Sequence, residues 1–283
     1  MARPDVDLAE RHATSRKRSR RMVEIMELVT TRGSITLVEL SGALGVSSAT
    51  VRRDLADLEY QRLILRTHGG ATSVEARTEL PVTLRDSQFQ ESKRAIALRL
   101  TTLIPAERHA VALSGGSTTA MVARALSNHR DLTIVTNSLT IATLVTTFPQ
   151  LKVIMTGGQL RPQSLELVGV LAENTFNAIN VGTAILGTDG ISAEGGVTTH
   201  DETEARTNNA MVTHAGRAIV VADGSKIGRL TLAKVADIRQ IDVLITDDGA
   251  DRAELERIAG LGVEVHIVKP GGGSAEVIGG TGR

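Results

Sequence analysis

The alternation of apolar and helical segments after residue 92 constrains the fold of this chain most strongly. Almost continuously apolar runs are typical of parallel strands covered on both faces, and their alternation with helices indicates a doubly wound sheet. The apolar runs occupy residues 109–113, 132–136, 151–156, 181–187, 217–222, 243–246 and 263–268. The helical stretches occupy residues 92–103, 117–127, 138–147, 164–178, 201–214 and 251–259. We therefore predict an α/β domain with a mostly parallel, Rossmann-like sheet.

The first predicted strand ends in a polar turn that leads into a helix. The turn contains Ser114, Gly115, Gly116, Ser117, Thr118 and Thr119. Glycines allow close backbone approach, and a helix N-terminus with nearby hydroxyls can bind an anion, so the turn is a candidate phosphate site. The alternative is an ordinary turn with a self-capped helix. The turn matches neither the Walker A nor the GxGxxG pattern, which disfavours ATP and NAD.

Other polar segments follow later strands, at the sheet edge where such folds bind ligands. They are 136–138, 156–162 with Arg161, 187–205 with Asp189 and Glu204, and 223–228 with Lys226. His200 and Asp201 allow a metal site, but the chain has no cysteine and this segment has no HxxxH pair. We therefore expect Asp201 to cap a helix, and we predict no metal and no cofactor.

The first seventy residues differ in charge from the rest of the chain. They hold 12 basic and 9 acidic residues, a net charge of +3, and the basic excess lies in Arg11–Arg21. A helical stripe of apolar residues follows at 22, 25, 26 and 29. Thr36 and Glu39 form a capping box, and Ser47 can cap a further helix after a Gly-containing turn. This pattern predicts a helix-turn-helix, followed by a two-stranded wing around Gly69 and Gly70.

The second helix of that pair carries the residues that we expect to contact DNA. Such a helix enters the major groove with its N-terminus, where Arg reads guanine and Ser or Thr contacts bases or phosphates. The predicted DNA-binding residues are Ser48, Thr50, Arg52 and Arg53 on this helix, Arg66 and His68 on the wing, and Arg18 on a basic arm. The alternative for each arginine is a solvated or salt-bridged surface position, and Arg53 is spaced to pair with Asp57.

Taken together, these motifs resemble those of the DeoR-type bacterial transcriptional regulators. The matching residues are Arg21, Ile25, Val29, Ser47, the run Thr50-Val51-Arg52-Arg53-Asp54-Leu55, and the wing residues Arg66–Ala71. The later segments resemble, in order and spacing, the effector domain of the same family, which is related to ribose-5-phosphate isomerase. The resemblance covers residues 20 to about 268.

The resemblance implies a pocket for a phosphorylated sugar or a similar metabolite. It places the phosphate at Ser114–Thr119, with Lys93 as a further phosphate partner, and Asp189 and Glu204 facing the sugar hydroxyls. The segments around Asn137, Gly158 and Lys226 are expected to line this pocket.

Two departures from the related sequences bear on function. Ser114 stands where the family usually has Asp, which suggests a different metabolite. The isomerases carry a catalytic lysine, whereas this chain has no lysine between Lys152 and Lys226. Because enediol chemistry needs a cation for the developing oxyanion, we expect a sensor and not an enzyme. The alternatives are a sugar-phosphate isomerase with a DNA-binding appendage and a DNA-binding protein whose pocket is vestigial.

We divide the chain into a basic flexible arm (1–18), a winged helix-turn-helix domain (19–72), a linker (73–91), an effector-binding domain (92–268) and a flexible Gly-rich tail (269–283). The predicted function is that of a regulator, by family a repressor, of carbohydrate-metabolism genes. Its predicted partners are double-stranded operator DNA and a phosphorylated sugar, with no membrane partner. Paired half-sites on operators predict a homo-oligomer. The lack of cysteine fits a cytoplasmic location.

Overall fold

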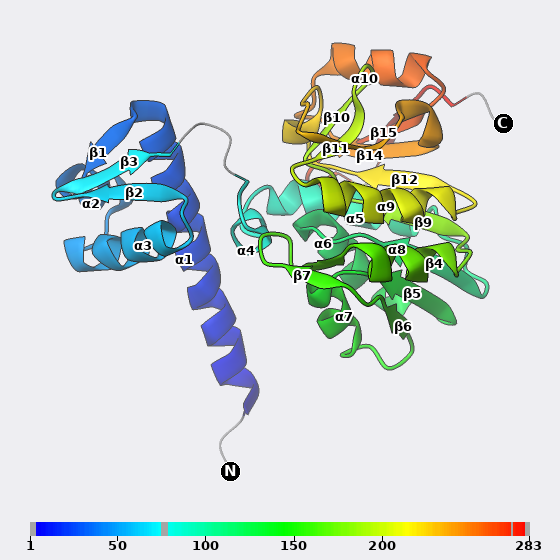
Figure 1. Cartoon of the computed structure of the whole chain (residues 1–283), viewed down its shortest axis with the longest axis horizontal. Coiled ribbons are helices and arrows are strands. Elements are labelled where there is room, and N and C mark those ends of the chain that lie inside the picture. Colours follow the sequence, from blue (N-terminus) through cyan, green and yellow to red (C-terminus); the bar gives the residue numbers. More distant parts are fainter. Residues whose placement is uncertain (1–3, 75–78, 273, 281–283) are drawn as a thin grey trace. The chain divides into compact units, whose positions relative to one another are not determined.

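A computed structural model describes residues 4–74, 79–272 and 274–280. It divides into two compact units, Met1–Gln88 and Phe89–Arg283 (Figure 1). The first unit contains the predicted DNA-binding elements, and the second contains the predicted effector domain. In the described residues, no helix is both long enough and apolar enough to cross a membrane.

The N-terminal unit is a helix-turn-helix with a small antiparallel sheet. Its elements are α1 (Pro4–Arg32), β1 (Ser34–Thr36), α2 (Leu37–Leu44), α3 (Ser48–Tyr60), β2 (Ile64–Thr67), β3 (Gly70–Ser73) and α4 (Val82–Arg85). The sheet order is β1-β3-β2, so β1 extends the predicted two-stranded wing by one strand. The predicted capping box on α2 is present, and the Ser47 side chain accepts from the Thr50 backbone N–H, which starts α3.

Apolar side chains at helical spacing close the core of this unit. Four of these side chains are fully buried: Ile25 of α1, Leu40 of α2, and Val51 and Leu58 of α3. Leu84 of α4 joins the same cluster, although it lies inside the predicted linker. Each such buried side chain contributes about 1.5–3 kcal/mol, so the three helices are held by packing more than by helix propensity.

The C-terminal unit is built on one eight-stranded sheet of order β16-β15-β14-β12-β9-β4-β5-β6. The strands are β4 (His109–Leu113), β5 (Leu132–Thr136), β6 (Lys152–Met155), β9 (Thr183–Leu186), β12 (Ala218–Val221), β14 (Val243–Asp247), β15 (Glu264–Val268) and β16 (Ala275–Ile278). All neighbouring pairs are parallel except β15 with β16. The predicted doubly wound, mostly parallel sheet is therefore present.

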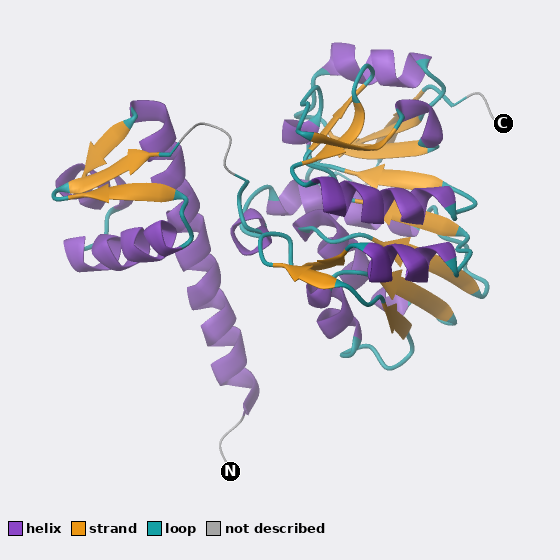
Figure 2. Cartoon of the chain, viewed as in Figure 1, coloured by secondary structure: helices purple, strands orange, loops and turns teal. Residues whose placement is uncertain are grey.

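Helices cover both faces of this sheet (Figure 2). They are α5 (Gln90–Thr101), α6 (Ser117–Ala125), α7 (Leu139–Val145), α8 (Val170–Asn177), α9 (Glu202–Thr213) and α10 (Arg252–Gly260). Successive residues of one strand serve opposite faces: Val111 and Leu113 belong to one apolar cluster and Ala112 belongs to the other. The inner strands are buried on both faces and are therefore continuous apolar runs in the sequence, whereas the edge strands β6 and β16 are exposed or half-buried along their length.

Two small sheets were not predicted. β10 (Gly190–Ser192) and β11 (Gly196–Thr199) lie in the polar segment 187–205, and they form an antiparallel sheet with β13 (Ala233–Ala236), which lies between the predicted strands 217–222 and 243–246. β7 (Gln159–Arg161) pairs with β8 (Glu166–Val168), so the helix predicted over residues 164–178 begins only at Val170. The positive φ of Gly169, 91°, separates this strand from α8.

The structure also differs from the prediction at both ends of the chain. Residues assigned to the flexible arm 1–18 continue α1 back to Pro4, because no Pro or Gly interrupts the run after Pro4. In the predicted flexible tail, Ala275–Ile278 form β16, which pairs with β15 at Val265–Val268. The Gly content of the tail concealed this strand, since its apolar residues are only Ala275, Val277 and Ile278.

Candidate functional site

In the N-terminal unit, α3 presents polar side chains on the face opposite its apolar one. Arg52 and Arg53 are exposed, whereas Val51 just before them and Leu55 just after them are buried. Ser48 and Thr50 near the start of α3 are half-buried. The Ser48 hydroxyl lies 3.2 Å from that of Ser41, and the Thr50 hydroxyl lies 3.0 Å from that of Ser47. Both arginines therefore have the exposure that base contacts require. The two pairs of hydroxyl groups, Ser41–Ser48 and Ser47–Thr50, also stabilise the turn before α3.

Asp54, the acidic residue of the same motif, has a structural role. Its side chain is 1% exposed, and its two carboxylate oxygens accept from Arg21 Nε at 2.5 Å and from Arg18 Nε at 3.2 Å. Arg18 also pairs with Asp57. These ion pairs join α1 to α3 and fix the angle at which α3 is presented. Arg18 thus has partners within the chain, and its contact with a DNA phosphate stays a prediction.

The wing is held against the start of α2 by backbone contacts. The Leu37 N–H donates to the Gly69 carbonyl at 2.7 Å, and a Cβ on Gly70 would lie 2.8 Å from the Thr36 Cα. The sequence therefore needs glycine at position 70 for close packing and not for a positive φ. Arg66 and His68 are exposed on this wing, and Arg66 lies 3.4 Å from the Glu59 carboxylate of α3.

In the C-terminal unit, the Ser114–Thr119 loop connects β4 to α6 at the carboxyl edge of the sheet. The Ser114 hydroxyl accepts from the Gly187 N–H at 3.0 Å, which ties the end of β4 to the end of β9. Gly116 has a φ of 126°, and no side chain caps α6. The first N–H groups of α6 therefore remain available to an anion beside the nearly buried hydroxyls of Ser117 and Thr118.

Glu166 of β8 is the functional candidate that sequence reasoning missed. Its carboxylate accepts from the Gly115 N–H at 2.5 Å, and its side chain is 1% exposed. Nothing in the apolar surroundings of Glu166 in the sequence singled it out. Only the pairing of Glu166 with Arg161 across the β7–β8 hairpin turns it toward the loop. The related sequence feature is the glycine at position 115, because in the structure a Cβ there would meet the Glu166 carboxyl group.

Glu204 and Asp189, two predicted pocket residues, share one hydroxyl. The Thr199 hydroxyl lies 2.6 Å from Glu204 Oε1 and 3.1 Å from Asp189 Oδ2. Arg161 lies 3.1 Å from Glu204 Oε2. Burial, followed by the negative charge of Glu166, raises the pKa of Glu204 well above its usual value. A protonated Glu204 could donate a hydrogen bond, which suits a neighbouring ligand oxygen.

Buried polar atoms without hydrogen-bond partners lie on segments around this edge. Asn137 follows β5, is fully buried, and its amide nitrogen donates to Asn208 of α9 at 3.4 Å. Among the described residues, the buried side-chain atoms without a hydrogen-bond partner include Asn137 Oδ1, Thr156 Oγ1 and Ser164 Oγ. Buried polar groups are nearly always satisfied, so these atoms indicate a place for a ligand or water.

The remaining predicted pocket residues lie on separate elements. Lys93 is on α5 and 2% exposed, and Lys226 ends the short helix η2 (Gly224–Lys226) after β12. Gly158 packs against the backbone of Val168, and a Cβ at position 158 would lie only 2.8 Å from the Val168 carbonyl oxygen. Glycine at this position therefore allows the β7–β8 hairpin to close. Asp201 caps α9, accepting from the Glu204 N–H at 2.9 Å, as predicted.

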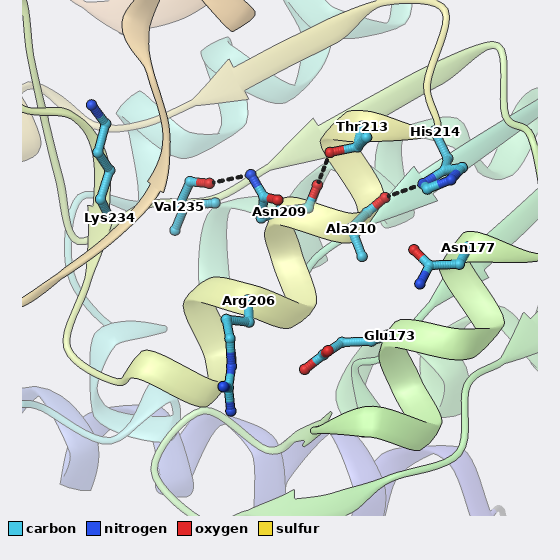
Figure 3. A pocket seen from close by; sticks show the side chains of 9 residues that line it. All are labelled: Glu173, Asn177, Arg206, Asn209, Ala210, Thr213, His214, Lys234 and Val235. Carbon is cyan, nitrogen blue, oxygen red and sulfur yellow. Dashed lines mark hydrogen bonds between the residues drawn. The ribbon is translucent and has the colours of Figure 1, made fainter.

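A separate cavity of about 520 Å³ lies between α8, α9 and β13 (Figure 3). Most of its lining residues are of polar types; the lining consists of Glu173, Asn177, Arg206, Asn209, Ala210, Thr213, His214, Lys234 and Val235. None of the predicted effector residues lies in it. Groups of three or more metal-ligating side chains are absent from the part of the chain that the structure describes.

Comparison with known proteins identifies both units. Residues 21–77 match the DeoR-like helix-turn-helix domain, and residues 88–248 match the DeoR C terminal sensor domain. The HTH-type transcriptional regulator GlpR of Haloferax volcanii is 38% identical, over 85% of this chain and 94% of its own length. The glycerol-3-phosphate regulon repressor of Escherichia coli K12 is 33% identical, over 82% of this chain and 91% of its own length.

Among solved structures, ribose 5-phosphate isomerase A of Methanocaldococcus jannaschii aligns with a TM-score of 0.36 and 15% identity, over 50% of this chain and 53% of that one. The two domain matches and the identities to curated regulators together cover most of the chain and confirm the resemblance drawn from its motifs. The chain belongs to the DeoR family of transcriptional regulators.

Proposed function

We propose that this protein represses transcription by binding operator DNA through α3, and that a phosphorylated sugar or polyol in the C-terminal unit controls this binding. The observation that carries the proposal is the pairing, in one chain, of an exposed arginine pair on α3 with an uncapped helix N-terminus at the edge of a parallel sheet. The exposed arginine pair would read DNA bases, and the uncapped N-terminus of α6 would bind a phosphate.

On the DNA side, Arg52 and Arg53 would contact base edges, since both are exposed near the N-terminus of α3. Arg66 and His68 on the wing would contact the phosphate backbone, which positions the protein without reading sequence. Two copies of α3 at the spacing of two half-sites would require a homo-oligomer, a dimer or a tetramer.

On the effector side, the α6 N-terminus with Ser117 and Thr118 would hold the phosphate. Glu204 and Asp189, joined through Thr199, would face the hydroxyl groups of the ligand. Carboxyl and amide groups at fixed positions suit a polyhydroxy compound, because each hydroxyl both donates and accepts. The glycerol-3-phosphate regulon repressor among the relatives is consistent with a small phosphorylated polyol as effector.

The relatives that match nearly full length are regulators and repressors, and this chain is a regulator and not an isomerase. Operator binding would place it in the cytoplasm. Ligand binding would change DNA affinity only if the ligand binds the DNA-competent and DNA-incompetent states unequally.

Direct binding measurements test both halves of the proposal. DNA sites are selected from a random library with the full chain, and affinities for the selected and a scrambled site are compared. We expect Arg53→Ala to lose about 1–3 kcal/mol of discrimination. Arg62→Ala, an exposed residue just beyond α3, is the matched control and should leave discrimination unchanged. Equal discrimination by wild type and Arg53→Ala would remove Arg53 from the base contacts.

The effector half is tested by calorimetry with pairs of phosphorylated and unphosphorylated sugars. We expect binding only of the phosphorylated member, and weaker binding after Thr118→Val, which removes one hydroxyl at the α6 N-terminus. Equal binding of both members of every pair would contradict a phosphate site at this loop.

A further inference from the structure

The loop proposed to bind phosphate already holds an anion that belongs to the chain. The Gly115 N–H donates to Glu166 Oε1 at 2.5 Å, and the Glu166 side chain is 1% exposed. Backbone N–H groups of a strand-to-helix loop are the donors that a phosphate uses. A carboxylate of β8 thus occupies one of the donors that an incoming phosphate needs.

The close approach of the carboxylate depends on the residue types of the loop. A Cβ at Gly115 would lie 2.5 Å from Glu166 Cδ and 2.7 Å from Glu166 Oε1, so only glycine permits this contact. The backbone around Glu166 is fixed on both sides, because Leu167 N–H donates to the Asn137 carbonyl at 2.7 Å and Leu139 N–H donates to the Leu165 carbonyl at 3.0 Å. Displacing the Glu166 carboxylate from Gly115 therefore requires rotation of its side chain and not a shift of the backbone.

Charge makes the carboxylate and a phosphate competitors. Glu166 already acts on Glu204, since its charge is, after burial, the largest cause that raises the pKa of Glu204. A phosphate at the same loop would add negative charge where carboxylates are crowded and water is largely excluded. One N–H proton cannot serve both anions at full strength, so the phosphate must displace Glu166 from Gly115.

We propose that Glu166 is a specificity-determining residue of the effector pocket, a built-in anion that the phosphate of the effector displaces from the Gly115 N–H. This inference rests on the proposed phosphate site at the loop. Glu166 weakens phosphate binding, and it excludes ligands that lack a strong anion, because a neutral hydroxyl does not compete with a carboxylate for this donor. Ligand binding also moves a side chain of the hairpin whose Arg161 contacts Glu204 and Asp201 of α9.

The test is the affinity of the full chain for inorganic phosphate and for phosphorylated sugars, measured by calorimetry. Glu166→Gln keeps the shape of the side chain and an acceptor for Gly115 but removes the charge. Its Kd for phosphate should fall about tenfold or more, the change that corresponds to about 1.4 kcal/mol. Glu202→Gln, an exposed glutamate at the start of α9, is the matched control and should change the Kd less than about twofold.

A second readout does not depend on the stability of a variant. In the ¹⁵N-labelled wild-type chain, the Gly115 amide resonance should shift on addition of inorganic phosphate, as its acceptor changes. An unchanged Kd in Glu166→Gln, or a Gly115 resonance that stays fixed while phosphate binds elsewhere in the loop, overturns this inference and leaves the proposed function standing. Failure of the wild type and the variant to bind phosphate or any phosphorylated sugar overturns both.

Discussion

Replacing Asp54 with asparagine should destabilise the N-terminal unit strongly, although Asp54 sits within the DNA-binding motif. The carboxylate is 1% exposed and accepts from Arg21 and Arg18 of α1. Asn keeps the shape of the side chain but removes the charge that joins α1 to α3. We therefore expect a loss of stability and not a specific loss of base recognition.

The size of the effect follows from the exposure of the three partners. Breaking a buried ion pair by removing one partner costs about 3–5 kcal/mol. The Arg21 and Arg18 side chains are 20% and 40% exposed, so water takes over part of their solvation. We expect a loss of about 2–3 kcal/mol in the free energy of unfolding.

Amide resonances of α3, followed in the ¹⁵N-labelled chain during urea unfolding, provide the assay. Residues Ser48–Tyr60 lie within the N-terminal unit, so these resonances report on that unit alone. With a slope of about 1 kcal/mol per M urea for a unit of this size, the unfolding midpoint should fall by about 2 M or more. Glu59→Gln, at the half-exposed pair with Arg66, should change stability by less than about 0.5 kcal/mol. If Asp54→Asn stays within about 0.5 kcal/mol of wild type, the structural role of the ion pairs is refuted.

Three further changes test other parts of the structure. The pKa of Glu204 is raised in the folded state, so its ionisation costs stability as pH rises above 4.5. Glu204→Gln should therefore raise Tm at pH 8, and this gain should vanish below pH 4.5. An equal gain at both pH values would contradict the raised pKa. Ser114→Ala leaves the Gly187 N–H without its acceptor and should cost about 1–3 kcal/mol in urea unfolding followed by circular dichroism, whereas a neutral result would show that water replaces the hydroxyl. Leu84→Ala should cost about 2–5 kcal/mol in urea unfolding followed through the same α3 amide resonances, and an unchanged unfolding midpoint would show that α4 does not stabilise the N-terminal unit.

Elements that depend on residues close together in the sequence were predictable from it. Each of the seven predicted strands is present, and six of them are apolar because the sheet buries both of their faces; β6 at the edge is apolar although Lys152–Met155 are exposed. The starts of α2 and α3 were predictable from Thr36, Glu39 and Ser47, since caps are hydrogen bonds between near neighbours in sequence. The loop at Ser114–Thr119 was located for the same reason.

Features that depend on distant pairing were not predictable. β8 forms by pairing with β7, which contains Arg161, and β16 forms by pairing with β15, which contains Val265. Neither β8 nor β16 has a strand-like sequence pattern of its own. Glu166 escaped notice because its function depends on a fold that brings position 166 to position 115. Asp54 was part of a recognised motif, yet only the packing of α1 on α3 assigns it to stability instead of DNA contact.

The affinity of the full chain for a selected operator, with and without a phosphorylated sugar that binds the C-terminal unit, tests the central claim most directly. The account predicts that this ligand changes the Kd for operator DNA by about fivefold or more, the range of ordinary allosteric coupling. It also predicts that the unphosphorylated sugar leaves the Kd unchanged. An operator Kd that is the same with saturating phosphorylated sugar as without it would contradict the claim that this pocket controls DNA binding.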